Sequence, residues 1–141
     1  MGGEGIDDGH VEVLLDARGI LVRNVRGFVR HGTLLAAHRE CDALLDRHAD
    51  VHLLLTDTLA IEGFESGVPM SSFRWLIAHR AQWHRAAMVT RSRSVAAVSS
   101  MFTRMLPGVL HRIFSDRDAA VAFLLAPTVN TTPKRRAQPP P

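Results

Sequence analysis

The 141-residue sequence has one cysteine, one lysine and no long hydrophobic run. Cys41 has no second cysteine to pair with, which excludes an intramolecular disulfide. No stretch approaches the roughly 18 consecutive apolar residues of a membrane-spanning helix. The acidic N-terminus also lacks the apolar region of a signal peptide. We therefore expect a cytoplasmic protein without a membrane span.

The basic residues are almost all arginines, because Lys134 is the only lysine. The net charge is +3 and the pI is about 10.4, since arginine does not titrate near neutral pH and a small excess raises the pI sharply. No basic stripe is interleaved with aromatic residues, so no nucleic-acid partner is predicted. The densest basic stretch, between Arg80 and Arg104, is better explained as a solvated helix face than as a phosphate-binding surface.

Sequence motifs for catalysis and metal binding are missing. There is no Gly-x-Ser-x-Gly elbow, no glycine-rich phosphate loop, no His-Glu-x-x-His motif and no paired-cysteine knuckle. His38 and Cys41 lie three residues apart in a helical pattern, but such a pair alone does not define a metal site. Glu40 and Asp42 flank Cys41 and would raise the pKa of its thiol. We predict no catalytic residue, no metal and no cofactor.

Hydrophobic periodicity predicts an α/β fold. Two apolar-rich strands, residues 11–15 and 20–27, flank a turn at residues 16–19, which indicates an antiparallel hairpin. Helices and strands then alternate, with helix 33–48, strand 51–56, helix 72–85, strand 86–90, helix 92–105, strand 109–114 and a last helix that ends near residue 125. This β-β-α-β-α-β-α-β-α order predicts a single domain with a mixed, mainly parallel sheet.

Both ends of the chain are predicted to be disordered. Residues 1–9 are rich in glycine and acidic residues, and residues 127–141 combine basic residues with a run of prolines. The folded domain is therefore expected to span residues 10–126.

Polar residues predict where the helices begin. Thr33 is the expected N-cap of the first long helix, and Ser71 or Ser72 that of the second. Ser92 or Ser94 is expected to start the third. Ser115 opens a Ser-x-x-Asp capping box before the last helix.

The first candidate site follows the most apolar strand. The run at residues 51–55 ends abruptly at Thr56 and Asp57, which is typical of a strand buried on both faces. In open α/β sheets, ligands bind just past the carboxyl ends of central strands. Two glycines and a proline predict a loop over residues 59–70. Thr56, Asp57 and residues 59–67 are therefore the first place to look for a site.

The succession of elements resembles the SpoIIAA-like (STAS-like) family, which is related in fold to anti-sigma factor antagonists and to CRAL-TRIO-type lipid carriers. The segments that carry the resemblance are the hairpin 11–27, the strand 51–57 that leads to Gly63-Phe64, the helix with Trp75 and Trp83 that leads into residues 85–89, and the strand 109–116 followed by the alanine-rich stretch 119–124. The resemblance implies a small cytoplasmic binding module without a known catalytic mechanism.

The resemblance also implies a modification site. In anti-sigma factor antagonists, a Ser-Gly pair at the start of a helix, after an acidic residue, is the regulatory phosphorylation site. Ser66 and Gly67 resemble this pair and follow Asp57 at a comparable interval. Pro69 and Met70 favour a helix that begins only at Ser72, which would leave Ser66 as a plain loop residue.

The sequence thus favours a non-enzymatic regulatory module that binds another protein. Binding would use the loop after residue 57 and the starts of the second and third helices. The alternative is a carrier or sensor of a small apolar ligand, held in a pocket lined by Phe73, Trp75, Leu76, Phe102 and Met105. An enzyme would need titrating groups gathered around Asp57, and a homodimer is left open. The candidate binding residues are Thr56, Asp57, Gly63, Phe64, Ser66, Gly67 and Trp75.

Overall fold

The structure, a computed structural model, describes residues 8–106 and 108–127. Its elements are β1 (His10–Leu15), β2 (Ile20–Val29), α1 (His31–Arg47), β3 (Leu53–Phe64), α2 (Val68–Ala78), β4 (Arg85–Val89), α3 (Arg93–Thr103), β5 (Leu110–Phe114) and α4 (Arg117–Leu125). The predicted fold class and element order are confirmed. Most of the two ends predicted to be disordered lies outside the described residues.

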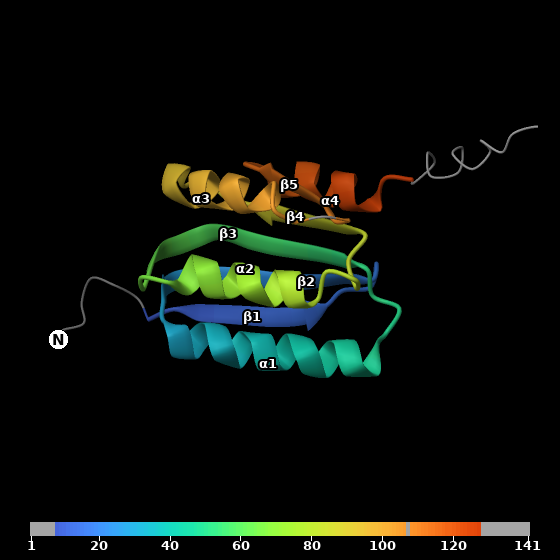
Figure 1. The fold of residues 1–141 in the computed structure, drawn as a ribbon, viewed down its shortest axis with the longest axis horizontal. Helices are drawn as coiled ribbons and strands as arrows, with labels where there is room; N and C mark the ends of the chain where they lie inside the picture. The colour runs from blue at the N-terminus through green and yellow to red at the C-terminus, as the bar shows by residue number, and fades with distance from the viewer. Residues whose placement is uncertain (1–7, 107, 128–141) are drawn as a thin grey trace, which may run out of the picture.

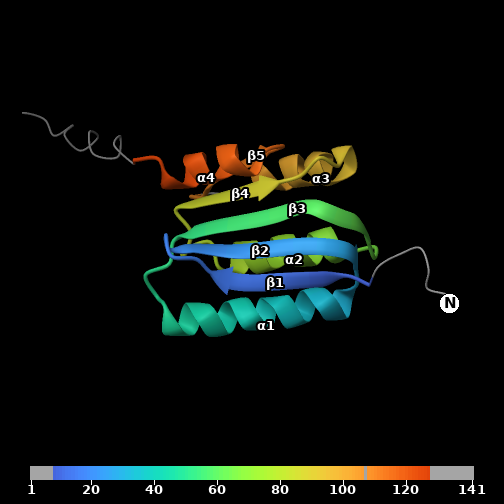
Figure 2. The same cartoon turned by 180° about the vertical axis from the view of Figure 1, so that it is seen from behind.

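The five strands form one sheet in the order β1-β2-β3-β4-β5 (Figures 1 and 2). β1 is antiparallel to β2, and the other neighbours are parallel. The hairpin turn is held by the Asp16 carboxylate, whose Oδ1 accepts hydrogen bonds from the amides of Arg18 and Ile20 at 2.9 and 3.0 Å. Gly19 takes a positive φ of 85° in this turn, a conformation that glycine adopts without strain.

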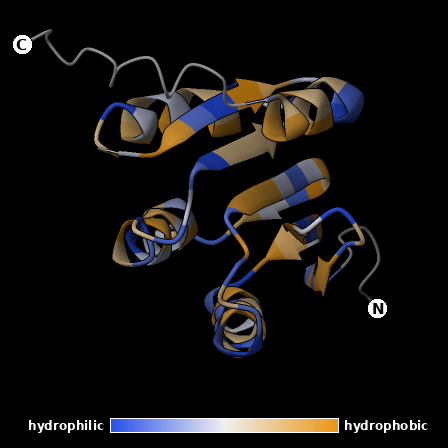
Figure 3. Cartoon of the chain, turned by 90° about the vertical axis from the view of Figure 1, so that its right-hand side faces the viewer, coloured by the Kyte–Doolittle hydropathy of each residue, from blue (hydrophilic) through white to orange (hydrophobic). Residues whose placement is uncertain are grey.

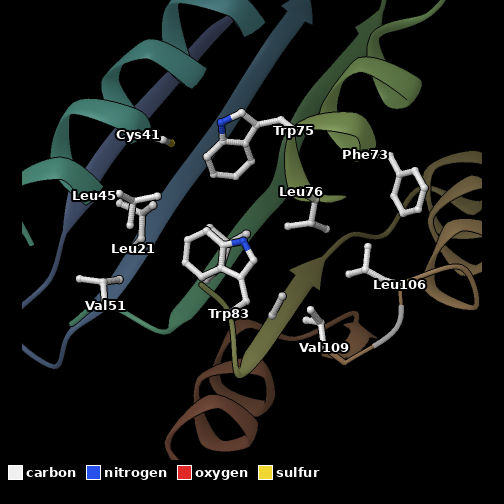
Figure 4. Packing of buried hydrophobic residues seen from close by; sticks show 12 residues of the cluster. Leu21, Cys41, Leu45, Val51, Phe73, Trp75, Leu76, Trp83, Leu106 and Val109 are labelled. Carbon is white, nitrogen blue, oxygen red and sulfur yellow. The ribbon is translucent and has the colours of Figure 1, made fainter. Parts of the chain in front are cut away.

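Helices cover both faces of the sheet (Figure 3). On one face, α1 and α2 pack over the sheet around a core that includes Trp75 and Trp83 (Figure 4). Phe102 of α3 packs against this core. On the other face, α4 buries Ala120 and Leu124 against Ile20, Val22 and their neighbours on the central strands. The two faces therefore have separate hydrophobic cores, as expected when right-handed crossovers place helices on both sides.

The prediction of a loop from residue 59 is wrong, because β3 continues to Phe64. Past Asp57, β3 no longer pairs with β4, but it stays paired with β2 until Val29 lies opposite Phe64. β2 itself is longer than predicted and supplies the partner that keeps this segment extended. Half-buried Leu59 and Ile61 alternate with more exposed neighbours, the pattern of a strand with one solvated face.

The starts of α1 and α2 and the end of α2 also differ from the prediction. α1 begins at His31 and not after Thr33, and α2 begins at Val68, well before Ser72. Pro69 lies in the first turn of α2, where a proline costs no hydrogen bond because the first amides of a helix have no intrahelical partner. α2 ends at Ala78, earlier than the predicted residue 85.

The helices on the C-terminal side are capped by side chains. Ser92 is the N-cap of α3, as predicted, and its hydroxyl accepts a hydrogen bond from the Val95 amide at 3.2 Å. Asp116 and not Ser115 caps α4, through an Oδ2 that accepts from the Ala119 amide at 2.8 Å. A carboxylate at this position also interacts favourably with the positive end of the helix dipole.

The α4 cap can be tested by stability. Asp116→Ala should lower the free energy of unfolding by about 1 kcal/mol, because it leaves a helix amide without its acceptor. Urea denaturation followed by circular dichroism measures the change. Ser115→Ala is the matched control and should change stability by only a few tenths of a kcal/mol. An equal loss in both variants would contradict the assignment of the cap.

Candidate functional site

Thr56 and Asp57 point to opposite faces of the sheet, because successive side chains of a strand alternate. Asp57 faces α4 and is buried. Its Oδ2 accepts a hydrogen bond from Nη1 of Arg117 at 2.7 Å, and its Oδ1 accepts from the Leu59 amide at 2.9 Å. The same Nη1 of Arg117 donates to Oδ1 of Asn24 at 2.8 Å. Asp57 therefore joins β3 to the first residue of α4, and both of its carboxylate oxygens are engaged.

Thr56 faces the other side, toward α2 and α3. Its Oγ1 accepts two hydrogen bonds from the Arg23 guanidinium, one from Nε at 3.1 Å and one from Nη2 at 2.7 Å. Arg23 and Thr56 are register partners on β2 and β3. Sequence proximity had grouped Thr56 with Asp57, but the structure places Thr56 with Arg23.

A cavity of about 110 Å³ lies between this face of the sheet and helices α2 and α3. Its wall is mostly apolar. The residues that form it include Val25, Phe64, Phe73, Leu76, Val98 and Phe102. Polar groups reach it from Arg23, Thr56, Ser99, Thr103 and His111. The predicted pocket residues Phe73, Leu76 and Phe102 do line the cavity, whereas Trp75 and Met105 do not. Met105 lies past the end of α3 and is exposed.

Among the described residues, Arg23 is the one charged side chain that lines the cavity, and it is only 4% exposed. Burial lowers the pKa of its guanidinium. The carbon at the centre of the guanidinium lies 5.2 Å from the centroid of the Trp75 ring, within the range of a cation–π interaction. Within residues 8–106 and 108–127, no carboxylate forms an ion pair with Arg23.

The histidines near Arg23 are neutral at physiological pH. Burial, with a smaller contribution from the positive charge of Arg23, lowers the pKa of His111 to about 4. Burial lowers the pKa of His38 to about 4 as well, again with a contribution from Arg23. The His38 ring stacks on Trp75 with 5.1 Å between centroids, so this histidine belongs to the core.

Cys41 is buried in α1 and faces the same core. Burial raises the pKa of its thiol to about 11, and the flanking Asp42 and Glu40 add smaller contributions in the same direction. The predicted direction is therefore right, but desolvation is the larger cause. A thiol with this pKa is a poor nucleophile at neutral pH.

Ser66 and Gly67 lie where the starts of α1 and α2 meet. Gly67 is the N-cap of α2 with a φ of 90°, and a Cβ added there would lie 3.3 Å from Cε1 of His31. His31 donates from Nε2 to the backbone carbonyl of Ser66 at 2.9 Å. The Glu65 carboxylate accepts a hydrogen bond from the His31 amide at 2.8 Å, so the turn after β3 supplies the acceptor that α1 lacks at its own N-cap. Ser66 itself is exposed.

The remaining candidates have packing roles. Gly63 lies against Phe28, because a Cβ at this position would come within 3.0 Å of the Phe28 ring. Phe64 lines the cavity at the end of β3. Trp75 is buried beside Arg23, and its Nε1 donates to Oδ1 of Asp42 at 3.0 Å. The candidates therefore separate into a cavity group, the turn at Ser66, and Asp57 on the opposite face.

Sequence reasoning missed Arg23 and His31. The signal for Arg23 was present, since it lies between Leu21 and Val25 on the strand face that is otherwise apolar. A charged residue in such a position is almost never fully buried unless something pairs with it. His31 had no comparable signal, because its role depends on the distant turn at Glu65 and Ser66.

The part of the chain that the structure describes contains no group of three or more His, Cys, Asp or Glu side chains that could hold a metal ion. None of the helices in it has the length and hydrophobicity needed to cross a membrane.

The chain belongs to the SpoIIAA-like family, whose model matches residues 20–125. The matched segment includes β2 to α4, and therefore the turn at Ser66, the Asp57–Arg117 pair and every cavity-lining residue except Val11 of β1. Among proteins with curated functions, none matches the sequence significantly.

Solved structures share the fold at low sequence identity. An uncharacterised protein from Shewanella loihica with a SpoIIAA-like fold aligns with a TM-score of 0.65 and 13% identity, over 88% of this chain and 98% of that one. An anti-sigma factor antagonist from Mycobacterium paratuberculosis aligns with a TM-score of 0.56 and 16% identity, over 82% and 93%. The anti-sigma factor antagonist SpoIIAA in its unphosphorylated form aligns with a TM-score of 0.56 and 15% identity, over 80% and 94%.

The tie between β3 and α4 predicts a stability loss. Arg117→Ala should lower the free energy of unfolding by about 1–3 kcal/mol, because it removes the partner of a buried carboxylate. Urea denaturation at neutral pH measures the loss. Arg91→Ala, which removes an exposed arginine, is the control and should have little effect. A loss no larger than that of the control would contradict a structural role for the Asp57–Arg117 pair.

The lowered pKa of His111 predicts a pH dependence of stability. Its pKa is about 4 when folded and about 6.5 when unfolded, so the unfolded chain takes up the proton first. The free energy of unfolding should stay level above pH 6.5 and fall between pH 6.5 and pH 4, by at most about 3 kcal/mol from this group. Denaturation curves across this range should be less steeply pH-dependent for His111→Gln than for the wild type.

The control for this experiment is His48→Gln, at an exposed histidine after α1. This variant should follow the wild-type pH profile. If His111→Gln also follows it, the prediction for His111 is wrong.

Proposed function

We propose that this domain is a non-enzymatic regulatory module that binds another protein through the corner formed by Glu65, Ser66 and Gly67 and the first turns of α1 and α2. The observation that carries the proposal is the position of Ser66. It is exposed, directly precedes the N-cap of α2, and contacts the start of α1 through His31. Family membership and the shared fold of two anti-sigma factor antagonists support a regulatory role.

The corner has the composition of a docking surface. Leu35 in α1 and Met70 in α2 are large apolar residues near the starts of these helices, and they are 51% and 41% exposed. Arg30 directly precedes α1. Its side chain is 56% exposed, and its Nη1 lies 3.9 Å from the Glu65 carboxylate. Exposed apolar residues next to an arginine are typical of the centre of protein interfaces.

A phosphate on Ser66 would change this surface. It would add a charge of about −1.5 to −2 beside two helix N-termini, where the helix dipoles favour an anion, and close to Arg30. The added charge would compete with Glu65 for Arg30 and for the start of α1. This gives the corner two states that a protein partner can distinguish.

The state of two reactive groups supports a non-enzymatic role. Cys41 is buried with a raised pKa, and both oxygens of Asp57 accept hydrogen bonds from protein groups. Neither side chain is prepared to act as a nucleophile or a base.

The regulatory proposal can be tested with protein purified from its own host. Native mass spectrometry should show a bound protein partner, and denaturing mass analysis should show a fraction with an added mass of about 80 daltons on Ser66.

With the partner identified, Ser66→Asp should weaken its binding about tenfold or more, whereas Ser66→Ala should keep it. Ser100→Asp, at an exposed position in the middle of α3, is the matched control. Equal affinity of Ser66→Asp and the wild type would contradict the proposal.

A second function is favoured by a separate observation, the apolar cavity beneath α2 and α3. This cavity supports the alternative of a carrier or sensor of a small apolar ligand. In the same native mass experiment, a bound small molecule that is lost on denaturation would support this alternative.

A further inference from the structure

We propose that the cavity beneath α2 and α3 binds a small carboxylic acid with an apolar body, and that Arg23 receives its carboxylate. This inference deepens the ligand-binding alternative and rests on the cavity being a ligand site. Its basis is a buried guanidinium that lines an apolar cavity and lacks a negative partner among the described residues.

The hydrogen bonds of Arg23 leave part of its guanidinium free. The group has five N–H donors. One on Nε and one on Nη2 are used, and both go to the same Thr56 hydroxyl. Within residues 8–106 and 108–127, the remaining three, on Nη1 and Nη2, have no acceptor. Arg23 lines the cavity, and a positive charge in a mostly apolar wall favours an anionic partner from outside the chain.

The free donors have the geometry for a carboxylate. Because Thr56 occupies the Nε side, the unused donors include those along the Nη1–Nη2 edge, which can bind both oxygens of a carboxylate in parallel. The Trp75 ring lies over the guanidinium, with 5.2 Å between the ring centroid and the guanidinium carbon. The hydrogen bonds to the Thr56 hydroxyl keep the guanidinium from rotating within its own plane. The side chain is therefore held in position before any ligand arrives, which lowers the entropic cost of binding.

Charge matching selects a monoanion. In the part of the chain that the structure describes, Arg23 is the one charged group that lines the cavity, and His111 beside it is neutral at physiological pH because burial lowers its pKa to about 4. A single carboxylate balances the single positive charge. A phosphate monoester would bring nearly two negative charges and leave one of them buried without a partner.

The size and lining of the cavity define the rest of the ligand. Its volume is about 110 Å³, somewhat smaller than an engineered apolar cavity of about 150 Å³ that binds benzene. The walls are formed largely by side chains such as Phe64, Leu76, Val98 and Phe102, which offer no hydrogen bonds to a sugar or a nucleobase. The volume therefore limits the apolar body to at most about one aromatic ring or a short alkyl chain.

The test uses two carboxylates and their neutral amides as probes. Benzoate and hexanoate should bind the full-length protein at pH 7, as measured by calorimetry or by ligand-observed NMR. Benzamide and hexanamide, which match them in shape, should bind about tenfold or more weakly, because they lack the charge that pairs with Arg23. Val98→Phe, which adds volume to the cavity wall, should abolish binding of all four probes and so locate the site.

Variants of Arg23 test its role directly. Arg23→Met keeps the length of the side chain and removes the charge, so carboxylate affinity should fall about tenfold or more while amide affinity is unchanged. If Arg23→Met does not fold, Arg23→Lys takes its place. Lysine keeps the charge but cannot donate two parallel hydrogen bonds, so its carboxylate affinity should lie between that of the wild type and that of an uncharged side chain. Arg26→Met, at an exposed arginine on the same strand, is the matched control and should bind all probes as the wild type does.

The outcomes separate this inference from the function on which it rests. If amides bind as tightly as carboxylates and the Arg23 variants change neither, the cavity remains a ligand site but the role of Arg23 is wrong. If no probe binds at millimolar concentration, the inference and the ligand-binding alternative are both wrong, and the proposal for Ser66 is unaffected. If carboxylates bind but Val98→Phe does not disturb them, the assigned site is wrong.

Discussion

The parallel pairing of β2 with β3 determines where every candidate site residue lies. It runs from the partners Ile20 and Leu53 to Val29 and Phe64, well past the end of β4. Because the pairing fixes the register, Thr56 lies opposite Arg23 and faces the cavity, while Asp57 turns toward α4. The same pairing ends at Phe64, directly before Glu65. The Glu65 carboxylate accepts a hydrogen bond from the first amide of α1. A shift of one residue in this register would exchange the two faces of β3 and remove the contacts of both Thr56 and Asp57.

Arg23 explains several features of the surrounding core that packing alone does not. A buried guanidinium is expensive unless its surroundings compensate, and here the compensation comes from one hydroxyl and one aromatic ring. Its positive charge also contributes to the lowered pKa values of His38 and His111, which keeps further positive charge out of the same region. An apolar residue at this position would stabilise the fold more than a buried arginine does. The stability lost to Arg23 is therefore consistent with selection for binding.

The sequence was sufficient for the order of elements and for the hairpin, because strong periodicity and a Gly-containing turn are local signals. It was insufficient where the outcome depended on a distant partner. Residues 59–64 are extended because β2 is beside them, and Pro69 lies inside a first helical turn although it had suggested a later start. For the candidate site, Ser66 and Thr56 were predicted from their positions in the chain. The full wall of the cavity was out of reach because it comes from all five strands and from α1, α2 and α3, and the cavity volume depends on how these elements pack.

The two proposed sites share one helix. α2 begins directly after Ser66, and its side chains Phe73 and Leu76 form part of the cavity wall. A ligand beneath α2 and a phosphate at its N-terminus therefore act on the same element, although they act from different sides. If the two prefer different positions of α2, then each must change the affinity for the other by the same factor, since coupling between binding sites is reciprocal. The fold thus allows a small acid in the cavity to adjust how the corner at Ser66 binds a protein, without any direct contact between the two.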